Sequence, residues 1–234
     1  MKSVEERALE SGGISLDPIY RMLARAIDEH RLRPDILLDV GCGRADFSPL
    51  ARERSQRYVG VDVVRHAGFP ADLELVLVDL ESGRVPLADG FADVVVCAET
   101  IEHVENPRAL ARELVRLVRP GGWVFITTPN QLSLASLLCL LGRGEFQAFQ
   151  EIPGSYPAHL SALLEIDLVR IARECGLADI EIRYSGSGRV PLTAHHWPKP
   201  FQASRGRRAR AFSDNVLVCG AKPKVTQRDR TPAA

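Results

Sequence analysis

The chain has 234 residues, of which 45% are apolar and 26% are charged, and its 30 basic residues balance 30 acidic ones. This composition is typical of one large globular domain and excludes bulk disorder, while zero net charge removes any general attraction to nucleic acid or an anionic membrane. Five widely spaced cysteines exclude a local CxxC motif and a fully paired disulfide framework. A charged N-terminus without an apolar leader, and no apolar run as long as a bilayer span, predict a reduced cytoplasmic protein.

Two helices are expected to open the chain, the second with Asp17 as its N-cap and Pro18 as its first residue. An apolar strand over residues 36–40 ends at Gly41-Cys42-Gly43, and a helix is expected over 45–54. Further strands are predicted over 58–63, 73–80 and 92–98, a helix over 106–118, and a strand over 123–127 after the turn at 119–122. Because apolar strands alternate with helices, the pattern predicts an α/β fold whose parallel strands are covered on both faces.

The last third of the chain has a different pattern. Residues 132–141 predict a strongly apolar helix, 166–175 an amphipathic helix, and 180–184 and 215–220 two more strands. The apolar helix is expected to be buried, although residues 132–149 would also suit a cover over an acceptor pocket or peripheral contact with lipid. The loop between the last two strands carries a basic run from Arg205 to Arg210, expected to be solvated, and residues 223–234 are expected to form a flexible tail.

The turn after the first strand is the first candidate ligand site. Gly41 and Gly43 let the backbone approach a ligand closely, and the helix that follows offers free amides, although such a turn also occurs without any ligand. A nicotinamide dinucleotide site would place Gly or Ala at position 46. Asp46 stands there instead and would repel a pyrophosphate, which disfavours an NAD-dependent oxidoreductase.

Acidic residues stand at the ends of four successive predicted strands, at Asp39, Asp62, Asp79 and Glu99. Open α/β sheets bind ligands at the carboxyl ends of their strands. Asp62 suits two ribose hydroxyls, and Asp79 with the amide of Leu80 suits an adenine ring, unless Asp79 only caps a turn. Because sulfonium and ammonium groups need nearby anions, the carboxylates favour a cationic cofactor over a phosphorylated one.

These motifs together resemble a class I S-adenosylmethionine-dependent methyltransferase of the small-molecule type. LDVGCG is similar to the first motif of that family, VGVDVV to its ribose strand, LVDLESGRVPLADGFADVVVCAETIEHVENP to its adenine and following motifs, and LVRPGGWVFITTPN to its fifth-strand motif. The resemblance covers residues 35–130. It implies a doubly wound, Rossmann-like, mostly parallel seven-stranded sheet with a C-terminal antiparallel hairpin.

The resemblance also implies one methyltransferase domain over residues 1–222, with N-terminal helices in 1–34, the cofactor-binding core in 35–130, and the acceptor-binding part with the last two strands in 131–222. Its cofactor would be S-adenosyl-L-methionine. The contacts it implies are Asp39, Gly41 and Gly43 at the methionine end, Asp62 at the ribose, Asp79 and Leu80 at the adenine, and Glu99 beside the methionine moiety. Arg44 departs from the small residue usual in the family, and suits either the methionine carboxylate or solvent.

Methyl transfer is a displacement at carbon, so the protein must chiefly align the acceptor, the methyl group and the sulfur. The expected acceptor is a small or medium-sized molecule, and a hydroxyl of a sugar, lipid or secondary metabolite would need a base. The resemblance implies that His159 lies in a segment that a sugar-, lipid- and quinone-methylating subgroup uses for acceptor contact, and His103 is the alternative base unless it only orients its loop. No metal site is expected, because the adjacent His195 and His196 cannot share a helix face.

Two other functions stay open. An RNA methyltransferase is disfavoured by the zero net charge, so nucleic acid is not an expected partner, but the basic run at 205–210 keeps it open. A non-catalytic cofactor-binding module on the same fold would be expected to lack some of the acidic residues, and all are present. A radical enzyme using the same cofactor would need clustered cysteines for an iron–sulfur cluster, and the sequence has none.

Overall fold

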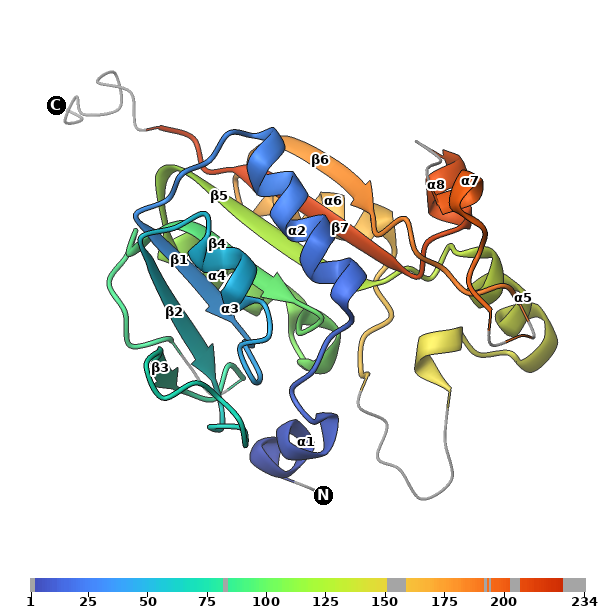
Figure 1. Ribbon diagram of the computed structural model, residues 1–234, viewed down its shortest axis with the longest axis horizontal. Coiled ribbons are helices and arrows are strands. Elements are labelled where there is room, and N and C mark those ends of the chain that lie inside the picture. Colours follow the sequence, from blue (N-terminus) through green and yellow to red (C-terminus); the bar gives the residue numbers. More distant parts are fainter. Residues whose placement is uncertain are drawn as a thin grey trace, which may run out of the picture.

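The computed structural model describes residues 3–81, 84–150, 159–191, 193, 195–202 and 207–224. Its centre is a seven-stranded sheet with the strand order β3-β2-β1-β4-β5-β7-β6 (Figure 1). Strands β1 to β5 pair in parallel, whereas β7 is antiparallel to both β5 and β6, which confirms the expected doubly wound sheet with its C-terminal antiparallel pair. The strands are β1 Ile36–Val40, β2 Arg57–Asp62, β3 Glu74–Leu77, β4 Ala92–Ala98, β5 Val118–Pro129, β6 Ala178–Tyr184 and β7 Asn215–Ala221.

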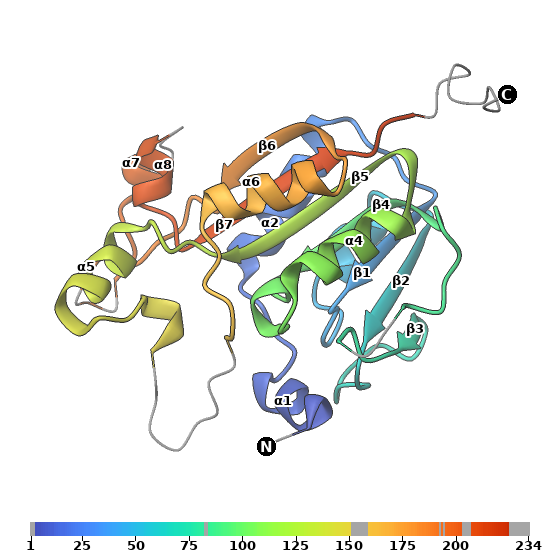
Figure 2. The same ribbon diagram turned by 180° about the vertical axis from the view of Figure 1, so that it is seen from behind.

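Helices cover both faces of the sheet. Helices α2 and α3 lie on one face (Figure 1), and α4 and α6 lie on the other (Figure 2). In both views α1 lies near the carboxyl end of β2, and α5, α7 and α8 form a lobe that projects beyond the sheet. The helices are α1 Val4–Ser11, α2 Asp17–Glu29, α3 Ser48–Arg52, α4 Pro107–Leu117, α5 Leu134–Arg143, α6 Glu165–Glu174, α7 Lys199–Gln202 and α8 Arg207–Ala211, with 3₁₀ turns η1 Ile101–His103 and η2 Gln147–Phe149.

Successive strand residues point into two separate apolar cores. Leu37 and Val94 pack in the core beneath α2 and α3, whereas their neighbours Leu38 and Val95 pack in the core beneath α4 and α6. All four side chains are fully buried or nearly so. Because side chains alternate across a strand and both faces are covered, strands of this kind read as continuous apolar runs.

Helix α4 shows how local sequence directs an element onto the sheet. The side chain of Asn106 accepts a hydrogen bond from a backbone amide in the first turn, and Pro107 stands where a missing amide leaves nothing unpaired. Leu110 and Leu114, one turn apart, are buried against the sheet. The cap and the apolar spacing therefore specify the same helix.

Helix α2 corrects one expectation about a helix start. Its first residue is Asp17 itself, and the preceding Leu16 makes no side-chain cap, so the prediction of Asp17 as N-cap is wrong. The Asp17 carboxylate instead accepts a 2.6 Å hydrogen bond from Nε of Arg21, one turn further on. Its negative charge still lies at the positive end of the helix dipole.

Several predicted bounds also differ from the structure. Strand β5 begins at Val118 and so includes the predicted turn at 119–122, because a register shift opposite β4 accommodates Gly121 with its φ of 82°. Strand β3 is shorter than predicted and pairs with β2 at the edge of the sheet, and α3 is shorter at both ends. Helices α7 and α8 lie within the expected loop.

Helix α5 is not the buried helix that its composition predicts. Only Ala135 and Ser136 are buried, whereas Leu138 is 45% and Leu141 is 83% exposed. The helix projects from the sheet with the lobe (Figure 1), so no sheet face lies beneath its leucines. Peripheral lipid contact through residues 132–149 stays a prediction.

In the part of the chain that the structure describes, none of the helices combines the length and the apolar character that crossing a membrane would require. Residues 151–158, which precede His159, the start of the basic run at Arg205, and the expected tail beyond residue 224 lie outside the described residues.

Candidate active site

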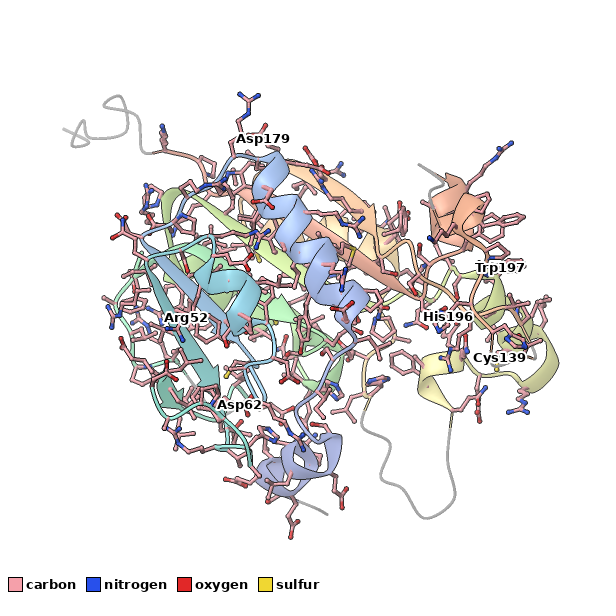
Figure 3. All side chains as sticks on the ribbon, viewed as in Figure 1. Arg52, Asp62, Cys139, Asp179, His196 and Trp197 are labelled. Carbon is pink, nitrogen blue, oxygen red and sulfur yellow. The ribbon has the colours of Figure 1, made fainter. Side chains whose placement is uncertain are left out.

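The carboxyl ends of β1, β2 and β4 border a cavity of about 370 Å³, which α1 and the segment before α2 border on another side. Figure 3 shows Asp62 at this end of β2, close to α1. The cavity brings together residues that are far apart in sequence. All of the sequence-predicted site residues line it: Asp39, Gly41, Gly43, Asp62, Asp79, Leu80, Glu99, His103 and His159. Arg44 does not line it.

The loop after β1 requires its two glycines. Gly41 and Gly43 have φ angles of 77° and 54°, in the left-handed region that other residues rarely adopt. A side chain on Gly41 would overlap Thr100, and one on Gly43 would overlap the backbone of Gly13. The amide of Arg44 donates a 2.9 Å hydrogen bond to the carbonyl of Gly13, so the segment before α2 packs directly on this loop.

Asp62 fastens the glycine loop to the end of β2. Its Oδ2 accepts a 2.8 Å hydrogen bond from the amide of Gly43, and its Oδ1 accepts one of 2.8 Å from the amide of Val63. Nε2 of His66 lies 3.8 Å from Oδ1. His66 also lines the cavity. His66 was not among the residues predicted from the sequence, although its position four residues after Asp62 was a usable signal.

Asp39 carries a buried oxygen without a partner. The residue is 2% exposed, and its Oδ2 accepts a 2.6 Å hydrogen bond from the hydroxyl of Tyr58. Its Oδ1 has no hydrogen-bond partner. Burial raises the pKa of Asp39 to about 7, against the opposing effect of the Tyr58 hydrogen bond.

Glu99 is held rigidly at the end of β4. Its φ of 48° is left-handed, a strained conformation of the kind found at functional sites. One carboxylate oxygen accepts a 2.8 Å hydrogen bond from the hydroxyl of Thr127, and the other accepts one of 2.8 Å from the side-chain amide of Asn215. Burial raises the pKa of Glu99 to about 7. Asn215 lines the cavity from β7, and no local sequence signal could have found it.

Asp79 and Leu80 lie at the cavity wall just beyond β3. Oδ1 of Asp79 accepts a 2.8 Å hydrogen bond from the amide of Glu81, so the carboxylate does cap a turn. Glu81 in turn forms a 3.0 Å ion pair with Arg7 of α1. This ion pair joins α1 to the strand ends across the cavity.

The two candidate bases lie together. His103 ends η1, and its ring meets the ring of His159 edge to face, with 4.7 Å between the centroids. Nδ1 of His159 lies 2.5 Å from the carbonyl oxygen of Ala148. Burial lowers the pKa of His159, which favours a neutral imidazole at neutral pH. A neutral imidazole can accept a proton.

The charge of the cavity wall is strongly unbalanced. Five acidic residues line it, namely Asp39, Asp62, Asp79, Glu81 and Glu99. Among the wall residues that the structure describes, Arg7 is the one arginine, no lysine occurs, and Arg7 is already paired with Glu81. Such a wall attracts a cationic ligand and repels a phosphorylated one.

Known proteins are similar to this chain in sequence and in fold. A family model described as a methyltransferase domain matches residues 16–182. The chain is 30% identical over 175 residues to the ubiquinone biosynthesis O-methyltransferase of Leptothrix cholodnii, covering 69% of this chain and 71% of that protein. It is 32% identical over 168 residues to the protein of the same name from Chromobacterium violaceum, covering 67% and 69%.

A solved structure from Thermotoga maritima, described as an S-adenosylmethionine-dependent methyltransferase and possible histamine N-methyltransferase, superposes with a TM-score of 0.63 at 16% identity. The superposition covers 87% of this chain and 89% of that one. At this identity the likeness shows the fold alone. The family model and the sequence relatives show more: the chain belongs to the methyltransferase domain family and is an S-adenosylmethionine-dependent methyltransferase.

The residues present fit S-adenosyl-L-methionine in charge and in space. The cofactor carries a sulfonium and an ammonium group, and the wall offers carboxylates, among them the unpartnered buried oxygen of Asp39. The glycine loop leaves room that a side chain at Gly41 or Gly43 would fill. A pyrophosphate cofactor would meet the same carboxylates as repulsive charges.

Cofactor affinity is expected to rise with pH up to about 7, by about ten-fold per pH unit for each carboxyl that loses a proton on binding. The reason is that Asp39 and Glu99, each with a pKa of about 7, are partly protonated below that pH, whereas a cationic ligand favours their charged forms. Calorimetry at about pH 6 and about pH 8, in two buffers with different ionisation heats, measures the affinity and the proton release.

The raised pKa values of Asp39 and Glu99 also predict how the stability of the cofactor-free protein depends on pH. Because the pKa values of Asp39 and Glu99 in the folded state lie above those in the unfolded chain, the folded state binds more protons between about pH 4 and pH 7, and stability falls as pH rises through this window.

Glu99→Gln is the control for the affinity prediction, since it removes one titrating group and should reduce the pH slope of cofactor affinity. If the affinity of the wild type for S-adenosyl-L-methionine does not change from about pH 6 to pH 8, the predicted rise of cofactor affinity with pH is contradicted.

Proposed function

We propose that this methyltransferase transfers the methyl group of S-adenosyl-L-methionine to a hydroxyl oxygen of a small or medium-sized acceptor of the quinone-like or secondary-metabolite kind. The observation that carries the proposal is that His103 and His159 line the same cavity as the acidic strand ends. The names of the relatives, which are O-methyltransferases, support oxygen as the methylated atom.

Each part of the cofactor has a proposed partner. Asp39 and the glycine loop would hold the methionine end, where the free oxygen of Asp39 suits an ammonium group. Asp62 would accept from the ribose hydroxyls, and Asp79 with Leu80 would border the adenine. Glu99, held by Thr127 and Asn215, would lie beside the methionine moiety. The proposed cofactor part of the chain is residues 35–130, and the acceptor part is residues 131–222.

The chemistry needs alignment first and a proton acceptor second. The bound sulfonium supplies a methyl carbon that already carries a good leaving group. The rigid carboxylates of Asp39 and Glu99 fix the position of the methionine end, which lowers the entropy cost of bringing an acceptor oxygen into line. His159, neutral and oriented by Ala148, can take the proton of the acceptor hydroxyl, and His103 is the alternative.

The first test is ligand binding. S-adenosyl-L-methionine and its demethylated product should bind in calorimetry, and NAD should not. Asp62→Asn should weaken both by about 10- to 100-fold, because it removes a charge-assisted hydrogen bond worth roughly 1.5–3 kcal/mol. Asp72→Asn is the matched control, since Asp72 pairs with Arg52 on the exposed surface and should leave binding unchanged.

Binding of NAD without binding of S-adenosyl-L-methionine would overturn the cofactor assignment. An unchanged dissociation constant in Asp62→Asn would show that another residue holds the ribose. A methyl-donor assay against hydroxylated quinone-like, sugar and lipid acceptors then tests the acceptor class. Transfer only to amines would contradict the proposed hydroxyl.

A further inference from the structure

His66 is a buried polar residue in the wall of the cavity. It lies in the segment that joins β2 to β3, and its side chain is 5% exposed. The residue lines the cavity beside the end of β2. Its Nε2 lies 3.8 Å from Oδ1 of Asp62, which is too far for a hydrogen bond.

The imidazole of His66 lacks a hydrogen-bond partner. Among the residues that the structure describes, none forms a hydrogen bond with either of its ring nitrogens. The oxygens of Asp62 already accept hydrogen bonds from the amides of Gly43 and Val63. Because buried polar groups are nearly always hydrogen-bonded, a ligand that fills the cavity must supply the partner of this ring.

Packing holds the ring in place before any ligand binds. A side chain on Gly13 would place its Cβ 2.8 Å from Cε1 and 2.9 Å from Cδ2 of His66, so the backbone of Gly13 lies directly against the imidazole. The carbonyl of Gly13 accepts a 2.9 Å hydrogen bond from the amide of Arg44, and the carbonyl of His66 accepts one of 3.1 Å from the amide of Phe69. A polar group fixed in this way binds a ligand with little further loss of entropy.

His66 and Asp62 complement each other as hydrogen-bonding groups. An ionised carboxylate only accepts hydrogen bonds, whereas a neutral imidazole donates through one nitrogen and accepts through the other. Two adjacent hydroxyls can therefore divide between them, one donating to Asp62 and the other bonding to His66. Two such groups 3.8 Å apart on one wall suit a vicinal diol, which is the pattern that a ribose presents.

We propose that His66 is a further cofactor-binding residue, which forms a hydrogen bond with one ribose hydroxyl of S-adenosyl-L-methionine beside the hydroxyl held by Asp62. The assignment rests on the proposed function, in which Asp62 accepts from the ribose. The pair makes the site selective for a ribose with both hydroxyls over a deoxyribose, because a missing hydroxyl leaves a buried polar group unpaired.

Substitution separates this polar contact from a packing role. His66→Phe keeps an aromatic ring against Gly13 but removes both nitrogens. His66→Gln removes the ring but keeps a side-chain N–H. A residue that serves only to pack against Gly13 would tolerate phenylalanine better than glutamine, whereas a residue that bonds a hydroxyl would show the opposite order.

The test is calorimetry of the full chain with S-adenosyl-L-homocysteine, the demethylated product, and with its 2′-deoxy and 3′-deoxy analogues. His66→Phe should bind the parent ligand about ten-fold more weakly, and His66→Gln should stay within about three-fold of wild type. For one of the two analogues, the difference between wild type and His66→Phe should vanish, because the hydroxyl that His66 contacts is already absent.

His30→Phe is the matched control for the substitution. His30 packs against Trp123, with 3.9 Å between the ring centroids, and does not line the cavity. Its replacement should leave the affinity for all three ligands unchanged. If His66→Phe does not fold by circular dichroism, His66→Ala takes its place, since comparing the parent ligand with the deoxy analogues cancels the lost packing.

Unchanged affinity of His66→Phe for the parent ligand would overturn the proposal. An equal loss for the parent ligand and both analogues would also overturn it, because that result indicates packing alone. Failure of methyl transfer to hydroxylated acceptors would contradict the proposed function and leave the role of His66 intact, since binding is measured without an acceptor.

Discussion

His159→Gln is expected to lower turnover by about a hundred-fold to ten-thousand-fold while cofactor affinity stays unchanged, because the acceptor hydroxyl loses the group that assists its deprotonation. The imidazole lies beside His103 at the cavity wall, and its Nδ1 is engaged by Ala148. Single-turnover methyl transfer and calorimetry measure the two quantities separately. His195→Gln is the matched control, since His195 is exposed and does not line the cavity.

The same experiment on His103 separates catalysis from loop orientation. A residue that assists the chemistry loses turnover and keeps cofactor affinity, whereas one that only orients η1 loses affinity as well. Near-normal turnover in both His159→Gln and His103→Gln would contradict a role for either and leave alignment as the whole of catalysis.

Gly43→Ala is expected to destabilise the protein by about 2–5 kcal/mol and to weaken cofactor binding by at least about ten-fold. A left-handed backbone costs an alanine roughly 1–2 kcal/mol, and overpacking costs about 1–3 kcal/mol more. The new methyl group would lie 2.7 Å from the carbonyl carbon of Gly13, so the loop and the segment before α2 must separate. Asp62 would then lose the Gly43 amide that it holds.

Gly12→Ala measures the cost of a left-handed backbone conformation without the cost of overpacking. Gly12 has a φ of 72° at the end of α1, and an added side chain would meet nothing within 4 Å. The variant should therefore cost only about 1–2 kcal/mol and leave cofactor affinity unchanged. Chemical denaturation and calorimetry of the two variants provide the comparison. Equal effects of Gly12→Ala and Gly43→Ala would show that the contact with Gly13 is unimportant.

Local patterns predicted which strand-end residues would be brought together, and these residues line the cavity. Strands β1, β2 and β4 are largely apolar because helices cover both faces, and each has an acidic residue at or next to its carboxyl end, at Asp39, Asp62 and Glu99. Gly41 and Gly43 are visible because a positive φ is a local property of the backbone, and Asp62 is visible as the acidic residue that ends its strand. Parallel pairing and right-handed crossovers limit which strand orders are possible, but they do not select the observed one. The roles proposed for these residues toward the cofactor stay predictions.

Helix α5 shows where the same logic fails. Its leucines predict burial, but burial depends on whether another element lies against the helix, and α5 projects with the lobe beyond the sheet (Figure 2). The turn expected at 119–122 failed for a related reason. Val118 pairs with Ala92 and Trp123 pairs with Val94, so β5 includes residues 119–122 as an irregularity that neither register pairs.

The sequence by itself determined the alternation of strands and helices, the glycine loop and the acidic strand ends, because these follow from backbone conformation and from apolar periodicity over short spans. Only the tertiary structure decided that Asn215 holds Glu99 from β7, that the carboxylate of Glu102 is buried without a partner, and that His103 meets His159. The contact of Asn215 with Glu99 and the contact of His103 with His159 each join segments more than fifty residues apart. They exist because strand order places β7 beside β5 and because backbone hydrogen bonds tie the segment after His159 to η1, and neither arrangement leaves a trace in local sequence.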